Sequence, residues 1–210
     1  MEFEKHPKYL LMYDEDQPER RQLIKIPPVF FESISGQPFN KCQVCEKPLL
    51  NSSVMYIIEK VFRKNPVNNK VEPLFEFAIC MDCAKALFDR FSDESKANIN
   101  KYFMENNGMM GMLTHRSGAY HVEDYLAKCA VTGAPVHQLD EYQIYGQFQG
   151  GMLKLDMPPY MIGASVMDEV QDLLSQKTID ELDDFTGEYL TGPPEFREFF
   201  KSPRRRPVFI

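Results

Sequence analysis

Two short stretches, KCQVCEKP at residues 41–48 and CMDC at residues 80–83, say more about the fold than any other part of the chain. Each contains a Cys-x-x-Cys pair, and residues 46–79 separate the two pairs. Paired thiolates converge readily on one ion, and tetrahedral sites of four thiolates select chiefly between zinc and iron. The sequence therefore predicts one structural Zn2+ site with the ligands Cys42, Cys45, Cys80 and Cys83.

The residues between and after the two pairs predict a β-hairpin followed by a helix. Residues 54–62 are rich in β-branched and aromatic side chains, and residues 74–79 alternate as a returning strand would. Asparagine and proline supply a turn between them. Apolar residues recur at helical spacing after residue 83, so the second pair should open a helix, where unpaired N–H groups stabilise thiolates.

A turn with two cysteines, a β-hairpin and a helix that opens with two cysteines together resemble the treble-clef zinc finger. The resemblance covers about residues 41–105, and the four cysteines match its ligand positions. It implies a zinc-binding scaffold and no particular activity, because treble clefs serve ribosomal, nuclease, ubiquitin-related and purely structural roles. The treble-clef nucleases need a histidine on the hairpin, and residues 46–79 contain none.

Two other uses of the cysteines stay open. A dithiol oxidoreductase could employ Cys80 and Cys83, which lie between a strand and a helix as in thioredoxin-like sites, but Cys42 and Cys45 would then have no role. Iron held as in rubredoxin needs the same four thiolates, although the glycines that usually follow each pair are absent. We expect zinc.

A second pattern repeats along the chain. KCxVxxxPL at residues 41–49 recurs as KCxVxxxPV at residues 128–136, an offset of 87. LxxxFSxxSxxxIxxY at residues 87–102 recurs as VxxxLSxxTxxxLxxF at residues 170–185, an offset of 83. These matches predict a degenerate second copy of the first lobe.

The second copy should hold no metal. Three of its ligand positions carry Thr132, Gly163 and Val166, and only Cys129 keeps a thiol. We interpret Cys129 as a small buried hydrophobic residue. Strands are expected at residues 142–148 and 152–157, around a Gly-Gly turn.

Charge and composition limit the classes of function. The net charge is −7, and residues 123–200 hold fifteen Asp and Glu against four Lys and Arg, a surface that repels phosphates and anionic lipid. No apolar run approaches the roughly 20 residues that span a bilayer, and the N-terminus is a poor signal peptide. We therefore expect a cytoplasmic protein with reduced cysteines and no membrane contact.

These features predict an α+β protein of two related treble-clef-like lobes, the first zinc-bound and the second metal-free. The expected boundaries are an N-terminal arm at 1–40, the zinc lobe at 41–105, a linker at 106–122, the degenerate lobe at 123–190 and a basic, aromatic tail at 191–210. We expect the tail to fold back on the acidic second half of its own chain.

The expected role is a non-catalytic interaction or assembly module with protein partners. The alternative is nucleic-acid binding by the hairpin at residues 60–70. Its basic residues are Lys60, Arg63, Lys64 and Lys70. A solvated loop is the commoner use of such a cluster.

Overall fold

The structure is a computed structural model that describes residues 23–106 and 121–189. The predicted tail at 191–210, residues 1–22 of the predicted arm and residues 107–120 of the predicted linker lie outside the described residues. The described chain has an α+β fold with one antiparallel sheet.

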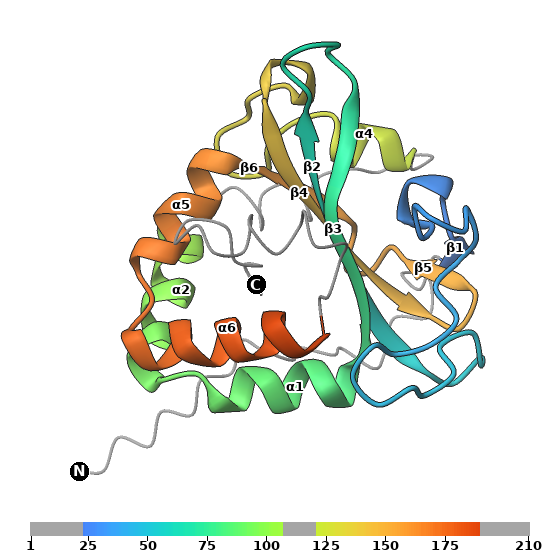
Figure 1. Cartoon of the computed structure of the whole chain (residues 1–210), viewed down its shortest axis with the longest axis horizontal. Helices are drawn as coiled ribbons and strands as arrows, with labels where there is room; N and C mark the ends of the chain where they lie inside the picture. The colour runs from blue at the N-terminus through green and yellow to red at the C-terminus, as the bar shows by residue number, and fades with distance from the viewer. Residues whose placement is uncertain (1–22, 107–120, 190–210) are drawn as a thin grey trace.

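A single six-stranded sheet runs through both predicted lobes (Figure 1). Strands β2 and β4 pair antiparallel along their length at its centre, with Ile58 opposite Gly146. Strand β3 pairs with the other side of β2. Strands β5 and β6 pair with opposite ends of β4, and β1 pairs with β5. The strands are β1 (Leu23–Lys25), β2 (Met55–Lys64), β3 (Val71–Cys80), β4 (Glu141–Gln149), β5 (Met152–Lys154) and β6 (Tyr160–Gly163).

The returning strand of the second hairpin is interrupted. The sequence predicts it at residues 152–157, but β5 ends at Lys154 and the chain rejoins β4 only as β6. Pro158 and Pro159 lie in the gap, and neither has an N–H to donate to a strand ladder. The second hairpin therefore returns in two short pieces, whereas β3 of the first hairpin runs unbroken over ten residues.

Four of the five described α-helices lie in two neighbouring pairs, α1 with α6 and α2 with α5 (Figure 1). Arg90 of α1 forms an ion pair with Glu181 of α6 at 3.2 Å, and the Tyr102 hydroxyl of α2 donates to Glu169 of α5 at 2.5 Å. None of the described helices has the length and apolar composition needed to cross a bilayer. They are α1 (Met81–Arg90), α2 (Asp93–Glu105), α4 (Val122–Leu126), α5 (Ala164–Asp172) and α6 (Gln176–Tyr189), with 3-10 helices η2 (Pro28–Phe30) and η3 (Val136–Gln138).

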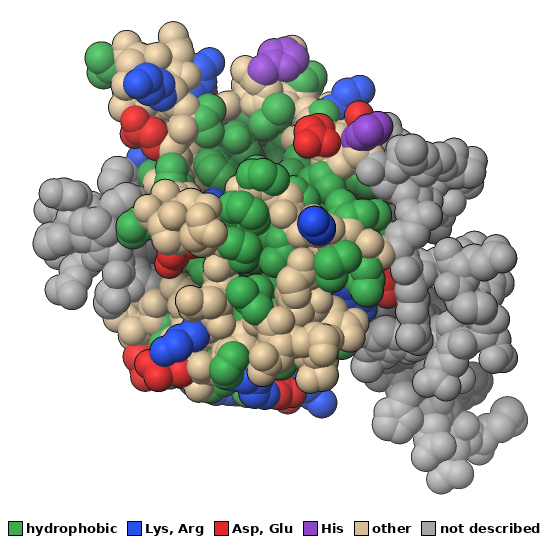
Figure 2. Space-filling model, turned by 90° about the vertical axis from the view of Figure 1, so that its right-hand side faces the viewer, with side chains coloured by type: hydrophobic (Ala, Val, Ile, Leu, Met, Phe, Trp, Pro, Cys, Tyr) green, Lys and Arg blue, Asp and Glu red, His purple; other side chains and the backbone are tan. Residues whose placement is uncertain are grey.

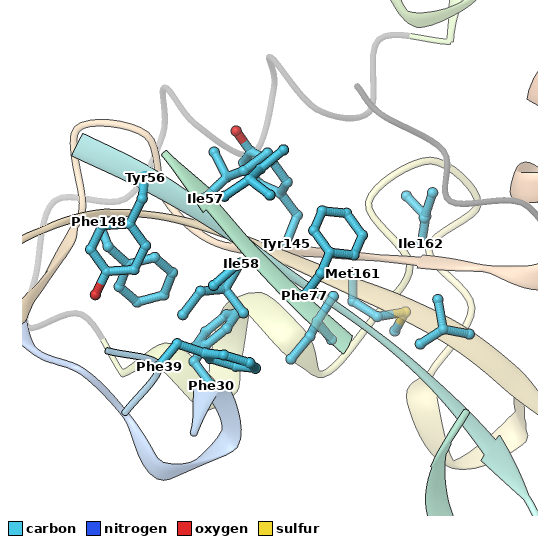
Figure 3. Packing of buried hydrophobic residues seen from close by; sticks show 14 of the residues in the cluster. Phe30, Phe39, Tyr56, Ile57, Ile58, Phe77, Tyr145, Phe148, Met161 and Ile162 are labelled. Atoms are coloured by element: carbon cyan, nitrogen blue, oxygen red, sulfur yellow. The ribbon is translucent and has the colours of Figure 1, made fainter. Parts of the chain in front are cut away.

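Alternate residues of each strand point to opposite sides of the sheet, and hydrophobic side chains are buried on both sides (Figure 3). On the face that we call the arm face, Phe30 of η2 meets Phe148 of β4 edge-on, with ring centroids 5.2 Å apart. On the face that we call the helix face, Phe77 of β3 meets Phe185 of α6 at 6.1 Å. The second cysteine pair lies where this sheet passes into its first helix, and the first pair lies on a turn beside that junction.

Candidate metal centre

The structure brings the four predicted cysteines together. Their sulfur atoms all lie within 4.8 Å of one another, and Cys45 Sγ is 3.7 Å from Cys80 Sγ. In a tetrahedral zinc site with Zn–S bonds of about 2.3 Å, neighbouring sulfurs are about 3.8 Å apart. The cluster can therefore hold a metal ion, and within the described residues it is the one group of three or more Cys, His, Asp or Glu side chains with this geometry.

The first cysteine pair lies on a tight turn. The Cys42 N–H donates to the Lys47 carbonyl at 2.9 Å, and the Glu46 N–H donates back to the Cys42 carbonyl at 2.8 Å. Glu46 has a φ of 57°, in the left-handed region that glycine adopts more easily. This turn points the side chains of Cys42 and Cys45 toward the same place.

The second cysteine pair spans the junction of a strand and a helix. Cys80 ends β3 and is the N-cap of α1, and Cys83 lies in the first turn of that helix. The Cys80 N–H donates to the Cys42 sulfur at 3.3 Å, so the backbone of one pair contacts the side chain of the other. Unpaired N–H groups at a helix start favour thiolates.

Gln43 attaches the turn to the sheet. Its N–H donates to the Ala78 carbonyl at 3.0 Å, and its Oε1 accepts the Ala78 N–H at 2.8 Å. This pair of bonds occupies the edge of β3 two residues before Cys80. Sequence reasoning missed Gln43, because nothing marks an internal residue of a Cys-x-x-Cys pair as a backbone partner.

The electrostatics of the thiols depend on their neighbours. Burial acts to raise the pKa of Cys42, but N–H donors from Cys80, Cys45 and Val44 outweigh it and lower that pKa to about 7. Burial raises the pKa of Cys80, and burial together with neighbouring sulfurs raises that of Cys83. The Cys42 thiolate thus forms easily while Cys80 and Cys83 resist ionisation, and a bound dication would offset the repulsion between thiolates.

A charged pair lies at the rim of the cluster. Lys47 Nζ contacts the Asp82 carboxylate at 2.6 Å, which joins the first turn to α1. Asp82 raises the pKa of Lys47 most, and the charges on Cys80 and Cys45 add to the effect. Lys47 is therefore close enough to the sulfurs to offset part of their negative charge.

The described residues around Cys129 in the second half hold no such cluster. The Cys129 sulfur is fully buried and accepts N–H bonds from Thr132 and from Gly163, each at 3.4 Å. The two described histidines, His121 and His137, are exposed and lie apart at the surface (Figure 2).

The basic hairpin differs from its expected form. Lys60 is only 3% exposed and points into the arm face, where its Nζ contacts Glu76 at 2.9 Å and donates to the Phe31 carbonyl at 2.5 Å. Arg63 forms an ion pair with Glu141 at 2.9 Å. These two cations serve internal contacts, so Lys64 and Lys70 remain as the basic residues toward the hairpin turn.

Comparison of the chain with protein-family models, with curated proteins and with solved structures finds no match.

Proposed function

We propose that the chain is a zinc-binding, non-catalytic interaction or assembly module of the cytoplasm. The observation that carries the proposal is the convergence of four cysteine sulfurs within 4.8 Å of one another. Four protein ligands complete a tetrahedral zinc shell and leave no open position for water or substrate, which is typical of structural sites. The ion would fasten the turn at Cys42 to the start of α1.

A zinc site is favoured over a dithiol redox centre because the sulfurs of both cysteine pairs lie in one cluster. Cys80 Sγ lies 3.7 Å from Cys45 Sγ, and the Cys80 N–H contacts Cys42 Sγ, so Cys80 and Cys83 do not stand alone as a dithiol. Zinc and iron accept the same four thiolates. Metal analysis separates them.

The experiment is elemental analysis of the purified full chain, followed by replacement with Co2+. We expect about one zinc per chain, and for cobalt the visible absorption of a tetrahedral tetrathiolate site. Cys80→Ser should lose the metal and unfold the first half, because structural zinc in small domains contributes an apparent ~10–16 kcal/mol. Cys129→Ser is the matched control and should keep one zinc. Folded wild-type protein with iron, or with far less than one metal per chain, would refute the proposal.

We further propose that residues 41–105 and 123–190 are related treble-clef-like lobes, the second of which has lost its metal. Backbone contacts at the two turns support this. Cys129 N–H donates to the Ala134 carbonyl at 2.8 Å, as Cys42 N–H does to the Lys47 carbonyl, 87 residues earlier. Isolated bridges join Lys41 to Pro48 and Lys128 to Pro135 at the same offset.

The sulfur contacts and the helix boundaries support the same relationship. The Gly163 N–H donates to the Cys129 sulfur at 3.4 Å, which parallels the bond from Cys80 to Cys42. Helices α5 and α6 begin at residues 164 and 176, each 83 residues after the starts of α1 and α2. In the second lobe Cys129 would then still accept backbone N–H bonds at its sulfur, as a metal-binding cysteine does, but would bind no metal.

A protein partner fits the surface better than a nucleic acid does. Leu23 of β1 and Val29 of η2 are about 40% exposed, and Figure 2 shows hydrophobic side chains gathered on the side of the molecule that carries β1, β5 and α4. Exposed apolar patches of this kind are typical of protein interfaces. Binding that changes little with salt, measured with a co-purified partner, would support this choice.

A further inference from the structure

The helix face of the sheet carries an unusual row of polar side chains at its centre. We call Glu59 of β2 and Gln143, Tyr145 and Gln147 of β4 the polar row. Glu59 lies opposite Tyr145 in the strand register, and the Gln143 side-chain amide donates to Glu59 Oε2 at 2.8 Å. Gln147 donates to the Tyr145 hydroxyl at 3.0 Å. All four are buried, Glu59 completely.

One carboxylate oxygen of Glu59 makes no hydrogen bond to the described residues. That oxygen, Oε1, is buried, and the Thr186 hydroxyl of α6 is likewise buried and without a hydrogen-bond partner among the described residues. A buried polar atom without a partner costs about 1–3 kcal/mol, so such atoms normally face a donor or an acceptor. Burial raises the pKa of Glu59 well above its usual range, which favours the protonated carboxyl, a group that can both donate and accept hydrogen bonds.

The described helices border this region. In the projection of Figure 1, α1 and α6 run side by side below the sheet and α2 and α5 stand beside it, and none of the four crosses the middle of β2 and β4. The most extensive sheet contacts of the described helices are those of α1 with β2 and β3, of α4 with β6, and of α5 with β6 and β4.

The C-terminal segment starts next to this region. Helix α6 ends at Tyr189, whose ring is 5.3 Å from that of Phe185, and Phe185 in turn meets Phe77, the β3 neighbour of Glu59. Twenty-one residues follow, from 190 to 210. At about 3.3 Å per residue they reach up to about 70 Å, several times the distance across neighbouring strands about 4.8 Å apart.

The chemistry of that segment complements the surface. Its apolar residues, Phe196, Phe199 and Phe200, can pack against Tyr160, whose ring stacks on that of the buried Tyr145 at 4.8 Å. Any peptide segment carries backbone N–H and C=O groups of the kind that a buried carboxyl and a hydroxyl require. The segment also contains four basic residues near its end, and α6 exposes several carboxylates. The basic residues are Lys201, Arg204, Arg205 and Arg206, and the acidic ones include Asp180, Asp183, Asp184 and Glu188.

We propose that residues 190–210 dock in the same chain on the helix face, over the polar row and beside α6. The tether favours this occupant over a second copy or a foreign peptide, because it raises the local concentration of the segment to the millimolar range. The segment would satisfy Glu59 and Thr186 and bring its basic end to the carboxylates of α6. This docking does not depend on the metal.

The first test is photo-crosslinking in the full chain. With p-benzoylphenylalanine in place of Phe199, we expect crosslinks within one chain to peptides of β2, β4, β6 or α6. The matched control places the same group at Val67, which is 91% exposed at the hairpin turn and should give no such products. Crosslinks only between chains, or only to residues 26–40 of the arm face, would overturn the proposal.

The second test reverses the charge of the segment without removing it. The variant R204E/R205E/R206E should exchange the amide hydrogens of residues 57–61 and 143–147 about tenfold faster than wild type, while still binding the same amount of zinc. The control K64E/K70E changes two hairpin cations and should leave those rates unaltered. Unchanged exchange in the triple variant, together with wild-type crosslinks elsewhere, would refute docking at this face.

Discussion

The hydroxyl oxygens of Ser92 and Ser175 lie 2.8 Å apart, at the point where the two halves of the chain meet. Each serine precedes a helix, α2 or α6. The Ser92 N–H donates to Thr178 Oγ1 at 3.0 Å, and the Ser175 N–H donates to Ser95 Oγ at 2.8 Å. The side chains of each half therefore satisfy backbone donors of the other, which couples the two halves energetically.

The hydrogen bonds between the Ser92 and Ser175 regions predict that mutations at the two serines affect stability in a coupled way. Ser92→Ala and Ser175→Ala should each lower the free energy of unfolding by ~1 kcal/mol, the usual cost of removing an N-cap. The double variant should lose less than the sum, because the two side chains share one network. Ser53→Ala, at an exposed position, is the control. Strict additivity in denaturant titrations would contradict the coupling.

Removal of the Gln43 side chain should weaken metal binding. Gln43→Ala deletes the bond from the Ala78 N–H that holds the first cysteine turn beside Cys80. Residues that support metal ligands typically contribute 10–100-fold to affinity, so we expect zinc affinity to fall about tenfold. Competition with a chromophoric chelator measures it, with Gln138→Ala of η3 as control. Equal affinities for the two variants would show that Gln43 has no supporting role.

Zinc binding should also depend on pH. The four thiols must lose their protons to bind the ion, so acidification should release it. Chelator competition across a pH series checks this. Metal retention independent of pH would be inconsistent with thiolate ligands.

Glu59 should make the fold less stable as pH rises. Its folded pKa lies well above the unfolded value, so the folded state keeps a proton that the unfolded state releases. The stabilisation is complete below the unfolded pKa, near 4.3, and is lost progressively as pH rises toward the folded pKa. Glu59→Gln should flatten this dependence in unfolding titrations from pH 4 to pH 8.

The groups that face Glu59 must be included in that comparison. Tyr145 of β4 lies opposite Glu59, and burial raises the pKa of the neighbouring Tyr160 of β6 well above this range. Arg63, on the same strand and face, is bound to Glu141. If the pH profile of Glu59→Gln matched the wild type between pH 4 and pH 8, Glu59 would be ionised in the folded state.

A second metal site should be recoverable. Introducing T132C, G163C and V166C places thiols at the three positions that the proposed repeat aligns with Cys45, Cys80 and Cys83. Gly163 has limited room, since a Cβ there would come within 3.2 Å of the Leu139 side chain, which is flexible enough to move. Elemental analysis should give two zinc ions per folded chain. A folded triple variant that still binds one would count against the proposed relationship between the lobes.

Nucleic-acid binding should be weak. We expect no affinity tighter than micromolar for DNA or RNA near physiological salt, because the overall charge is −7 and Lys60 and Arg63 are engaged internally. Anisotropy titrations at several salt concentrations would check this. Nanomolar binding that K64E/K70E abolished, with a slope of roughly −0.9 per phosphate contacted, would favour the nucleic-acid alternative.

Several elements follow from local sequence patterns alone. The first hairpin, the helix that opens at the second cysteine pair, and β4 lie within a few residues of their predicted positions. Such patterns depend on the spacing of neighbouring residues, which sequence displays directly. The Cys-x-x-Cys pairs likewise identify metal-binding chemistry because two thiols three residues apart suffice to share an ion.

Contacts between residues far apart in the chain could not be predicted from local sequence patterns. The charge of Lys60 indicates a solvated hairpin. The strand register instead places Lys60 opposite Glu76, with which it forms an ion pair, and its Nζ donates to the Phe31 carbonyl. Gln43 gives no signal in sequence, because its role depends on the edge of β3 lying beside it.

The sequence by itself determined the two cysteine pairs, the order of strands and helices around them and the acidic balance of the second half. Only the tertiary structure decided that β2 and β4 join the halves in one sheet, that α1 lies beside α6 and α2 beside α5, and that Glu59 is buried at the centre. These features arise from pairings between residues 67 to 94 positions apart. Local periodicity fixes which side of a strand or helix is apolar, but it leaves open which distant surface will cover that side.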